Sequence, residues 1–247
     1  MNKLTDPQED QENQYVFPYH YLTEYSEKIS ISKRWGWAIE YLGRIELIFN
    51  CLKDIDYKSY IDVGCGDGKL ISILSGNNKN KTYLGLDYSK NAIDLANALN
   101  SSIENTRYRV FDVFTEAADE EFDVLSMVEV MEHIEPEKLP IFLNNSLKFL
   151  KKNGFFIGSV PSKHLNLIPK HYQHFEIEQL KKIFLSHDLK VVELFYTDSK
   201  NKYVRFLIRI ALLVNSSKIH NIIFNYYKKN CLYNKDIGDG LFFICKK

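Results

Sequence analysis

Short apolar runs alternate with amphipathic stretches through the middle of the chain. The strands expected from the apolar runs are residues 58–63, 82–87, 107–111, 122–128, 154–160 and 240–245. Between them, residues 69–74, 91–99 and 137–150 carry apolar side chains at three- and four-residue spacing, which predicts helices. This alternation predicts an α/β fold with a mainly parallel sheet that is covered by helices on both faces.

The first predicted strand leads into a glycine-rich loop. Residues 60–70 read Tyr-Ile-Asp-Val-Gly-Cys-Gly-Asp-Gly-Lys-Leu. Because glycine has no Cβ, such a loop can turn tightly and approach a ligand. The next strand ends at Asp87, about 20 residues further on, where nucleotide-binding βαβ units place an acid that accepts hydrogen bonds from ribose hydroxyls. Together the two features predict a nucleoside pocket.

The spacing of the glycines indicates which nucleoside binds. Dinucleotide-binding loops read Gly-x-Gly-x-x-Gly and serve a pyrophosphate, whereas this loop reads Gly-x-Gly-x-Gly. Asp62 and Asp67 add negative charge that would repel a pyrophosphate and attract a cationic amino-acid group. S-adenosylmethionine carries such a group.

At this point the chain resembles the class I S-adenosylmethionine-dependent methyltransferases, whose first motif is an acid followed by Gly-x-Gly-x-Gly. Residues 109–113 stand where the adenine-side acid of the family lies, residues 122–127 resemble its fourth strand, and residues 151–157 resemble the turn into its fifth. The resemblance covers about residues 40–197 and the strand near 240–245. It implies a Rossmann-like, doubly wound, seven-stranded sheet, with S-adenosylmethionine as cofactor and S-adenosylhomocysteine as product.

Ligands of such sheets bind at the carboxyl ends of the strands, so acids scattered through the sequence are expected along one edge. Some of these acids have an alternative role as helix N-caps, which Asp favours. The residues expected to contact the cofactor are Asp62, Gly64, Cys65, Gly66, Gly68, Asp87, Tyr88, Asp112, Val113 and Val128.

Two polar segments follow the fourth and fifth strands. Residues 129–134 read Glu-Val-Met-Glu-His-Ile, and residues 170–176 read Lys-His-Tyr-Gln-His-Phe-Glu. A hydroxyl acceptor needs a general base, and His133 is the first candidate because imidazole titrates near neutral pH. His174 is the second candidate, and either histidine could instead be a hydrogen-bonded pocket residue. Glu129 and His171 are expected to contact the acceptor.

The Glu-x-x-Glu-His run resembles a motif of ubiquinone-pathway O-methyltransferases and of small-RNA terminal 2′-O-methyltransferases. In the RNA enzymes two acids and two histidines hold a divalent metal. The matching residues here are Glu129, Glu132, His133 and His174, and His171 could take the place of the last. The resemblance therefore raises the hypothesis of a bound divalent cation such as magnesium, for which carboxylate-plus-imidazole sites are suited.

The start of the chain is polar and is followed by an aromatic-rich segment. We expect residues 1–40 to form a lid and residues 41–247 to form one methyltransferase domain. Tyr19 and Tyr21 are then acceptor contacts, although this segment could equally pack on the domain without touching a ligand.

Positive charge is concentrated before the last strand. Residues 199–235 contain eight Lys and Arg and no Asp or Glu, although the formal net charge of the chain is zero. Apolar residues lie between these bases, which predicts two amphipathic helices at about 200–230. Three interpretations stay open: a cap over the acceptor pocket, recognition of a phosphorylated or nucleotide-linked acceptor, and weak peripheral contact with a membrane.

The remaining composition favours a cytoplasmic protein. The four cysteines form no Cys-x-x-Cys pair, which argues against a zinc knuckle or a disulfide framework. The polar start has no signal-peptide pattern, and no apolar run approaches the roughly 18 residues needed to span a bilayer. The sequence does not indicate an oligomeric state.

We expect methyl transfer to a hydroxyl of a small polar acceptor, such as a sugar, a nucleotide-linked metabolite or a phosphorylated one. Residues 159–162 and 169–175 resemble methyltransferases associated with surface-polysaccharide pathways. RNA 2′-O-methylation, methylation of a quinone-type phenol, N-methylation of a small amine and a catalytically silent binding protein stay open. The neutral charge and the lack of an appended RNA-binding module argue against nucleic acid.

Overall fold

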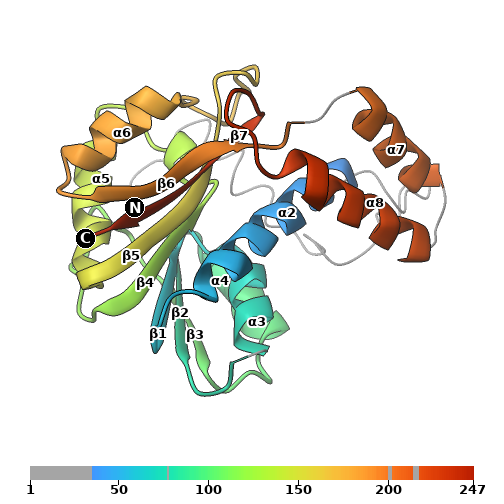
Figure 1. Ribbon diagram of the computed structural model, residues 1–247. Coiled ribbons are helices and arrows are strands. Elements are labelled where there is room, and N and C mark those ends of the chain that lie inside the picture. Colours follow the sequence, from blue (N-terminus) through green and yellow to red (C-terminus); the bar gives the residue numbers. More distant parts are fainter. Residues whose placement is uncertain (1–34, 77, 200–201, 214–216) are drawn as a thin grey trace.

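A mixed seven-stranded sheet forms the centre of the molecule (Figure 1). The computed structural model describes residues 35–76, 78–199, 202–213 and 217–247. The strand order is β3-β2-β1-β4-β5-β7-β6, in which β7 is antiparallel to both of its neighbours and the other pairs are parallel. The strands are β1 Ser59–Val63, β2 Thr82–Asp87, β3 Thr106–Val110, β4 Phe122–Val128, β5 Leu150–Pro161, β6 Lys190–Thr197 and β7 Gly240–Lys246.

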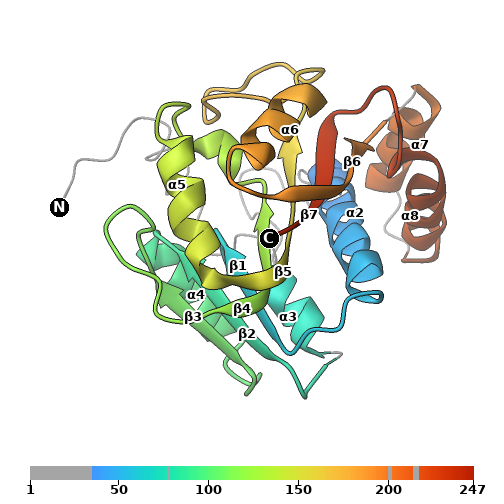
Figure 2. The same ribbon diagram turned by 60° about the vertical axis from the view of Figure 1, so that its left-hand side comes forward.

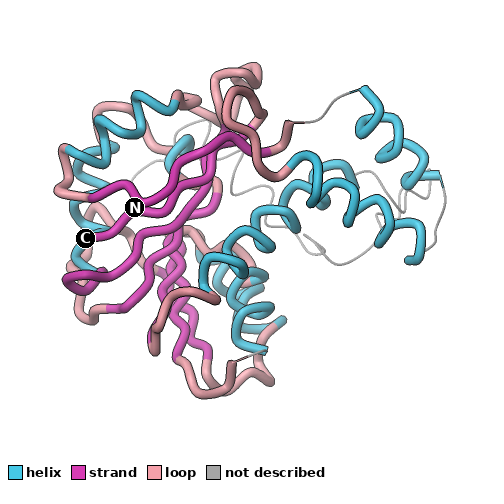
Figure 3. Tube along the Cα trace, viewed as in Figure 1, coloured by secondary structure: helices cyan, strands magenta, loops and turns pink. Residues whose placement is uncertain are grey.

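Helices cover both faces of the sheet (Figures 2 and 3). One apolar cluster packs α2, α3 and α4 on one face, and a second packs α5 and α6 on the other. The central strands are therefore buried on both sides, which explains why they read as apolar runs. The helices of the two layers are α2 Trp35–Leu52, α3 Lys69–Gly76, α4 Lys90–Leu99, α5 Leu139–Ser146 and α6 Ile177–Leu185.

Two further helices, α7 Lys202–Leu213 and α8 Ser217–Cys231, lie between β6 and β7 in the sequence. They pack on α2 rather than on the sheet, in a third apolar cluster that includes Ile39, Val204 and Tyr227. Figure 1 shows them on the far side of α2 from the strands. This confirms the helical insertion expected before the last strand.

Within the described residues, no helix is long and apolar enough to cross a bilayer.

Several boundaries differ from the sequence-based expectation. The helix expected at 137–150 is shorter: α5 ends at Ser146, a 3-10 turn follows, and β5 already begins at Leu150. Strand β6 was not predicted, because Glu193 interrupts its apolar run and this outermost strand is only partly buried. The expected lid boundary at residue 40 falls inside α2, and Tyr19 and Tyr21 lie outside the described residues.

Candidate active site

The glycine loop bends sharply from the end of β1 across the end of β2. Gly64, Gly66 and Gly68 all have positive φ, of 79°, 55° and 76°. The carbonyl of Leu86 accepts hydrogen bonds from the amides of Gly64 and Cys65, at 2.7 and 3.0 Å. A Cβ at residue 64 would lie 2.5 Å from a methyl group of Val130, so only glycine fits there.

Asp87 fixes this loop directly. One carboxylate oxygen accepts the amide of Gly66 at 3.0 Å, and the other accepts the amide of Ser89 at 2.9 Å. Ser89 in turn caps α4, because its hydroxyl accepts the amide of Ala92. Each carboxylate oxygen has two lone pairs, so an oxygen that accepts an amide can also accept a ribose hydroxyl. The same acid can therefore shape the loop and bind a nucleoside.

Asp62 lies beneath the loop and is 3% exposed. One of its carboxylate oxygens accepts the hydroxyl of Ser126, on the neighbouring strand β4, at 2.5 Å. Burial raises the pKa of Asp62 to about 7, and the hydrogen bond from Ser126 only partly offsets this. A cationic ligand group at this edge would favour the carboxylate form.

The other expected cofactor contacts lie at or near the same edge. Cys65 and Val113 are buried, Val128 is half-buried, and Tyr88 is 41% exposed. Asp112 follows β3, and its carboxylate accepts the amide of Phe114 at 2.9 Å. This contact belongs to a turn and not to a helix, so it differs from the helix N-cap that was the alternative role for these acids.

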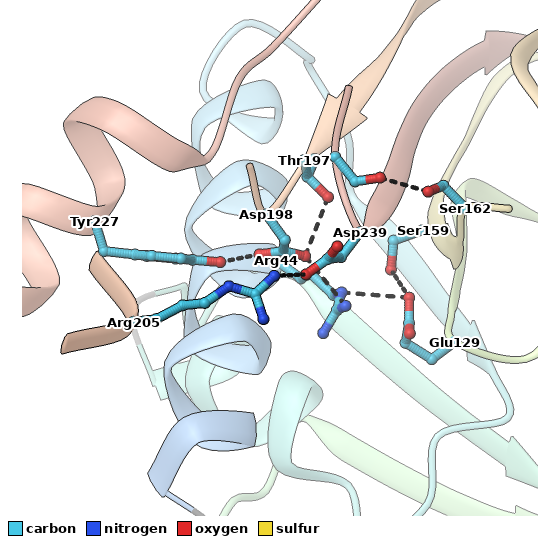
Figure 4. A network of polar contacts seen from close by, with 10 residues as sticks. Arg44, Glu129, Ser159, Ser162, Thr197, Asp198, Arg205, Tyr227 and Asp239 are labelled. Atoms are coloured by element: carbon cyan, nitrogen blue, oxygen red, sulfur yellow. Dashed lines mark hydrogen bonds and ion pairs between the residues drawn. The ribbon is translucent and has the colours of Figure 1, made fainter. Parts of the chain in front are cut away.

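Glu129 follows β4 directly and is held through one oxygen (Figure 4). Its Oε1 accepts the hydroxyl of Ser159 at 2.9 Å and lies 3.3 Å from Nε of Arg44. Its φ of 57° is unusual for a non-glycine residue. Its side chain is 26% exposed. The anchored Oε1 thus leaves Oε2 available to a ligand.

Arg44 connects this acid to the helical insertion. It projects from α2 and pairs through Nη2 with Asp198, which follows β6, at 3.2 Å. Asp198 is fully buried and also accepts hydrogen bonds from Thr197 and from Tyr227 of α8 (Figure 4). Burial alone would lower the pKa of Arg44, but the carboxylates of Glu129 and Asp198 raise it above its usual range.

Three histidines meet beyond the turn that follows β4. Nδ1 of His133 lies 2.9 Å from the carbonyl of Lys170, and Nδ1 of His174 lies 2.9 Å from that of Leu165. Since a carbonyl only accepts, both Nδ1 atoms carry hydrogen. Nδ1 of His171 lies 2.8 Å from Nε2 of His174, so one of these two nitrogens donates a hydrogen to the other. The ring of His133 is left with an unprotonated Nε2.

Burial keeps the imidazoles of His133 and His171 neutral. It lowers the pKa of His133 to about 4, and burial with neighbouring positive groups lowers that of His171 to about 3. Glu132 is fully buried beside them, and among the described residues neither of its carboxyl oxygens has a hydrogen-bond partner. Burial, with the charge of Glu129, raises the pKa of Glu132.

The geometry groups the candidate metal ligands differently from the sequence. One ligand atom each of Glu132, His133 and His171 lies within 4.8 Å of the others. The set expected from the resemblance also contained Glu129, and it named His174 as the second histidine with His171 as the alternative. Glu129 is instead engaged by Arg44 and Ser159, and both ring nitrogens of His174 are hydrogen-bonded.

A hollow of about 410 Å³ borders His174. His174 forms part of its wall, together with polar side chains that could meet a small ligand. The other lining residues are Lys163, Leu165, Asn166, Leu167 and Gln173.

A family profile described as "Methyltransferase domain" matches residues 40–194. The chain belongs to this methyltransferase family. The class I S-adenosylmethionine-dependent methyltransferase resemblance of the sequence is therefore confirmed, and so is the Rossmann-like seven-stranded sheet.

Relatives of this methyltransferase include the ubiquinone biosynthesis O-methyltransferase of Alkalilimnicola ehrlichii (strain ATCC BAA-1101 / DSM 17681 / MLHE-1). It is 29% identical over 133 residues, which are 52% of this chain and 50% of that protein. The chain thus spans about half the length of this curated relative.

Two solved structures show the same fold. The N-methyltransferase NodS from Bradyrhizobium japonicum WM9, in complex with S-adenosyl-L-homocysteine, has a TM-score of 0.58 and 15% identity, over 85% of this chain and 87% of that one. The magnesium protoporphyrin IX methyltransferase from Synechocystis PCC 6803, with bound S-adenosylmethionine, has a TM-score of 0.65 and 12% identity, over 100% of both chains.

The buried carboxyl group of Asp62 predicts a pH-dependent stability of the cofactor-free methyltransferase. Between the ordinary pKa of 3.8 and the folded value of about 7, the folded state holds a proton that the unfolded state has lost. Raising the pH through this window therefore destabilises the folded chain. Asp62→Asn keeps an acceptor for the hydroxyl of Ser126 but has no proton to lose. Between pH 5 and pH 7.5, the free energy of unfolding should therefore fall by about 2 to 3 kcal/mol less in Asp62→Asn than in wild type.

Urea unfolding of both proteins at the two pH values measures this difference. All other titrating groups are common to the pair, so the comparison isolates Asp62. Parallel pH dependences in wild type and Asp62→Asn would contradict the buried-carboxyl assignment.

Proposed function

We propose that this methyltransferase transfers the methyl group of S-adenosylmethionine to a hydroxyl of a small polar acceptor. The proposal is carried by the presence of two features in one chain. These are a glycine loop anchored on Asp87 and an unprotonated Nε2 on His133. The first feature suits a nucleoside with a cationic amino-acid group, and the second suits removal of a proton from a hydroxyl. Both follow carboxyl ends of adjacent parallel strands, where ligands of such sheets bind.

Asp87 would bind the ribose, and Asp62 would favour the cationic end of the cofactor. When bound, S-adenosylmethionine supplies an activated methyl group on a sulfonium. Its transfer is an in-line displacement, so the protein contributes chiefly by alignment, which can supply roughly 7 to 11 kcal/mol. Glu129 would orient the acceptor through Oε2, while His133 would take the hydroxyl proton on Nε2, a step worth about 10² to 10⁴ in rate.

The acceptor that we favour is a sugar, nucleotide-linked or phosphorylated hydroxyl compound. Polar side chains around the hollow beside His174, including Lys163, Asn166 and Gln173, support a polar acceptor. A quinone-type phenol is the second candidate, because the relative from Alkalilimnicola carries a ubiquinone-biosynthesis name. Four free cysteines are compatible with a reducing cytoplasm, where we propose that the protein acts.

A divalent cation at Glu132, His133 and His171 is a further part of the proposal. Two neutral imidazoles beside the buried carboxyl group of Glu132, which has no hydrogen-bond partner among the described residues, suit magnesium, manganese or zinc. When bound, such a cation would acidify an acceptor hydroxyl. Calorimetric titration with manganese tests this directly: wild type should bind and Glu132→Gln should not, whereas absence of binding to wild type would remove the cation.

Calorimetric titration with S-adenosylmethionine and S-adenosylhomocysteine, with NAD as control, tests the cofactor. Asp87→Ala should weaken binding of the sulfur nucleosides by about 1 to 3 kcal/mol, because both the ribose acceptor and the anchor of the Gly66 amide are lost. Asp94→Ala is the matched control, since this exposed acid of α4 pairs with Lys90 on the same helix. Equal affinity of wild type and Asp87→Ala would refute the ribose assignment.

The acceptor is tested by a screen with radiolabelled S-adenosylmethionine. Sugars and sugar nucleotides, catechol-type phenols, small amines and short RNA form the four arms, each with wild type and with a cofactor-binding variant as blank. Methylation confined to the first arm supports the proposal. Product in another arm would reassign the acceptor, and cofactor binding without product in every arm would support a silent binding protein.

A further inference from the structure

Four large apolar side chains are exposed on the helical insertion. Tyr203 and Phe206 of α7 are 56% and 57% exposed, and Ile222 and Tyr226 of α8 are 68% and 37% exposed. Each pair is spaced by one helical turn, and the rings of Tyr203 and Tyr226 lie 5.6 Å apart. The four residues therefore form one continuous surface, the outer patch.

The outer patch is not needed for packing of the insertion. The opposite faces of the two helices supply Val204, Ile208, Ile223 and Tyr227, which are at most 8% exposed and pack with Ile39 of α2. Single exposed apolar residues are common on soluble proteins, but a contiguous group is typical of an interaction surface.

Basic side chains surround the outer patch. On α8 the exposed residues Lys218, Ile222, Tyr226 and Lys229 follow one another at four-, four- and three-residue spacing, so they lie on one face. Arg209 is exposed on α7. Residues 199–235 hold eight of the 32 Lys and Arg and none of the 32 Asp and Glu, so the rest of the chain is net acidic.

We infer that the outer patch docks on an anionic lipid bilayer. Aromatic side chains favour the headgroup region, aliphatic ones enter the acyl boundary, and lysine and arginine pair with anionic headgroups. Figures 1 and 2 show α7 and α8 beyond α2, on the side away from the strands. The inference goes beyond the proposed function and does not depend on it.

The same features weigh against other occupants. In a two-fold dimer through this patch, the exposed bases Arg209, Lys218 and Lys229 of the two copies would come close together, and like charges repel. An RNA backbone would match the bases but would leave the side chain of Ile222 without a suitable partner. A bilayer satisfies both the apolar centre and the basic surroundings.

Vesicle co-sedimentation of the full chain tests the inference. The probes are vesicles of phosphatidylcholine alone and of phosphatidylcholine with about a quarter phosphatidylglycerol. We expect binding to the anionic vesicles at about 0.05 M salt and at least tenfold weaker binding at about 0.5 M, because salt screens the headgroup charge. Binding to neutral vesicles should be at least tenfold weaker as well.

Two double variants separate the contributions. Phe206→Glu with Ile222→Glu removes the apolar centre, and Lys218→Glu with Lys229→Glu reverses the charge. Each should weaken vesicle binding at least tenfold while S-adenosylhomocysteine affinity and the melting temperature stay at wild-type values. The matched control is Leu185→Glu, because Leu185 is 75% exposed on α6, in the layer on the other face of the sheet. It should bind like wild type.

Four outcomes of the binding and association assays would overturn the inference. They are absence of binding to anionic vesicles, equal losses in Leu185→Glu and in the patch variants, a dimer in light scattering that the patch variants abolish, and salt-sensitive binding of RNA in place of vesicles. A large fall in melting temperature of the patch variants would also overturn it, since the patch would then be covered within the chain. Failure of cofactor binding would leave the vesicle result valid, so the two proposals fail separately.

Discussion

Replacing Arg44 with methionine should lower the free energy of unfolding by about 3 to 5 kcal/mol, because one partner of a buried ion pair is removed. Asp198 is fully buried and pairs with the guanidinium of Arg44. In the variant, its carboxylate must either stay charged without this guanidinium or take up a proton. The hydrogen bonds from Thr197 and Tyr227 remain but do not neutralise it. Urea unfolding of the cofactor-free protein measures the loss.

Two comparisons make this result specific. Arg44→Met combined with Asp198→Asn should recover part of the loss, because the buried charge is gone and the amide oxygen still accepts from Tyr227. Lys90→Met is the control for an exposed pair, since Lys90 and Asp94 are 75% and 59% exposed, and it should cost less than about 1 kcal/mol. Equal losses in Arg44→Met and Lys90→Met would show that the buried network contributes little.

Arg44 is also expected to affect acceptor binding, because it holds the carboxylate of Glu129. Arg44→Lys keeps one positive charge but cannot hold Glu129 and Asp198 at once as a guanidinium does. If Glu129 orients the acceptor, this folded variant should raise the acceptor KM while the affinity for S-adenosylhomocysteine is unchanged. A purely structural role of Arg44 would leave the acceptor KM at the wild-type value.

The cofactor edge could be predicted from the sequence because its signals are local. Gly64, Gly66 and Gly68 stand within one short loop, and Asp87 ends the next strand, so a rule about the carboxyl ends of strands was sufficient to bring them together. The rule did not reveal that Asp87 accepts the amide of Gly66, because that contact depends on how the loop folds back over β2.

Arg44 and Asp198 could not be predicted in this way. They are separated by 154 positions, and each lies in a segment without a recognisable motif. An arginine in an amphipathic helix is normally exposed, but this one is 5% exposed because it lies against Glu129 after β4 and Asp198 after β6. The choice between His171 and His174 had the same difficulty, because it depends on which ring nitrogens are hydrogen-bonded to carbonyls.

Replacing His133 with alanine should lower kcat by about 10² to 10⁴ and leave the affinity for S-adenosylhomocysteine unchanged. The reason is that His133 presents an unprotonated Nε2, while its Nδ1 is fixed by the carbonyl of Lys170. His187→Ala is the matched control, because the ring of His187 contacts the carbonyls of Ile183 and Pro140, away from this cluster. Single-turnover rates with the acceptor identified by the screen measure the loss.

The variants around His133 distinguish the two ways in which it can serve the reaction. If His133 acts as a base, chelation leaves the wild-type rate intact, and Glu132→Gln and His171→Ala lose much less than His133→Ala. If the three residues hold a cation, chelation abolishes turnover and all three variants lose activity together, because each supplies one ligand atom of the same cluster. A His133→Ala enzyme with wild-type kcat would exclude both roles and leave His133 as a hydrogen-bonded wall of the pocket.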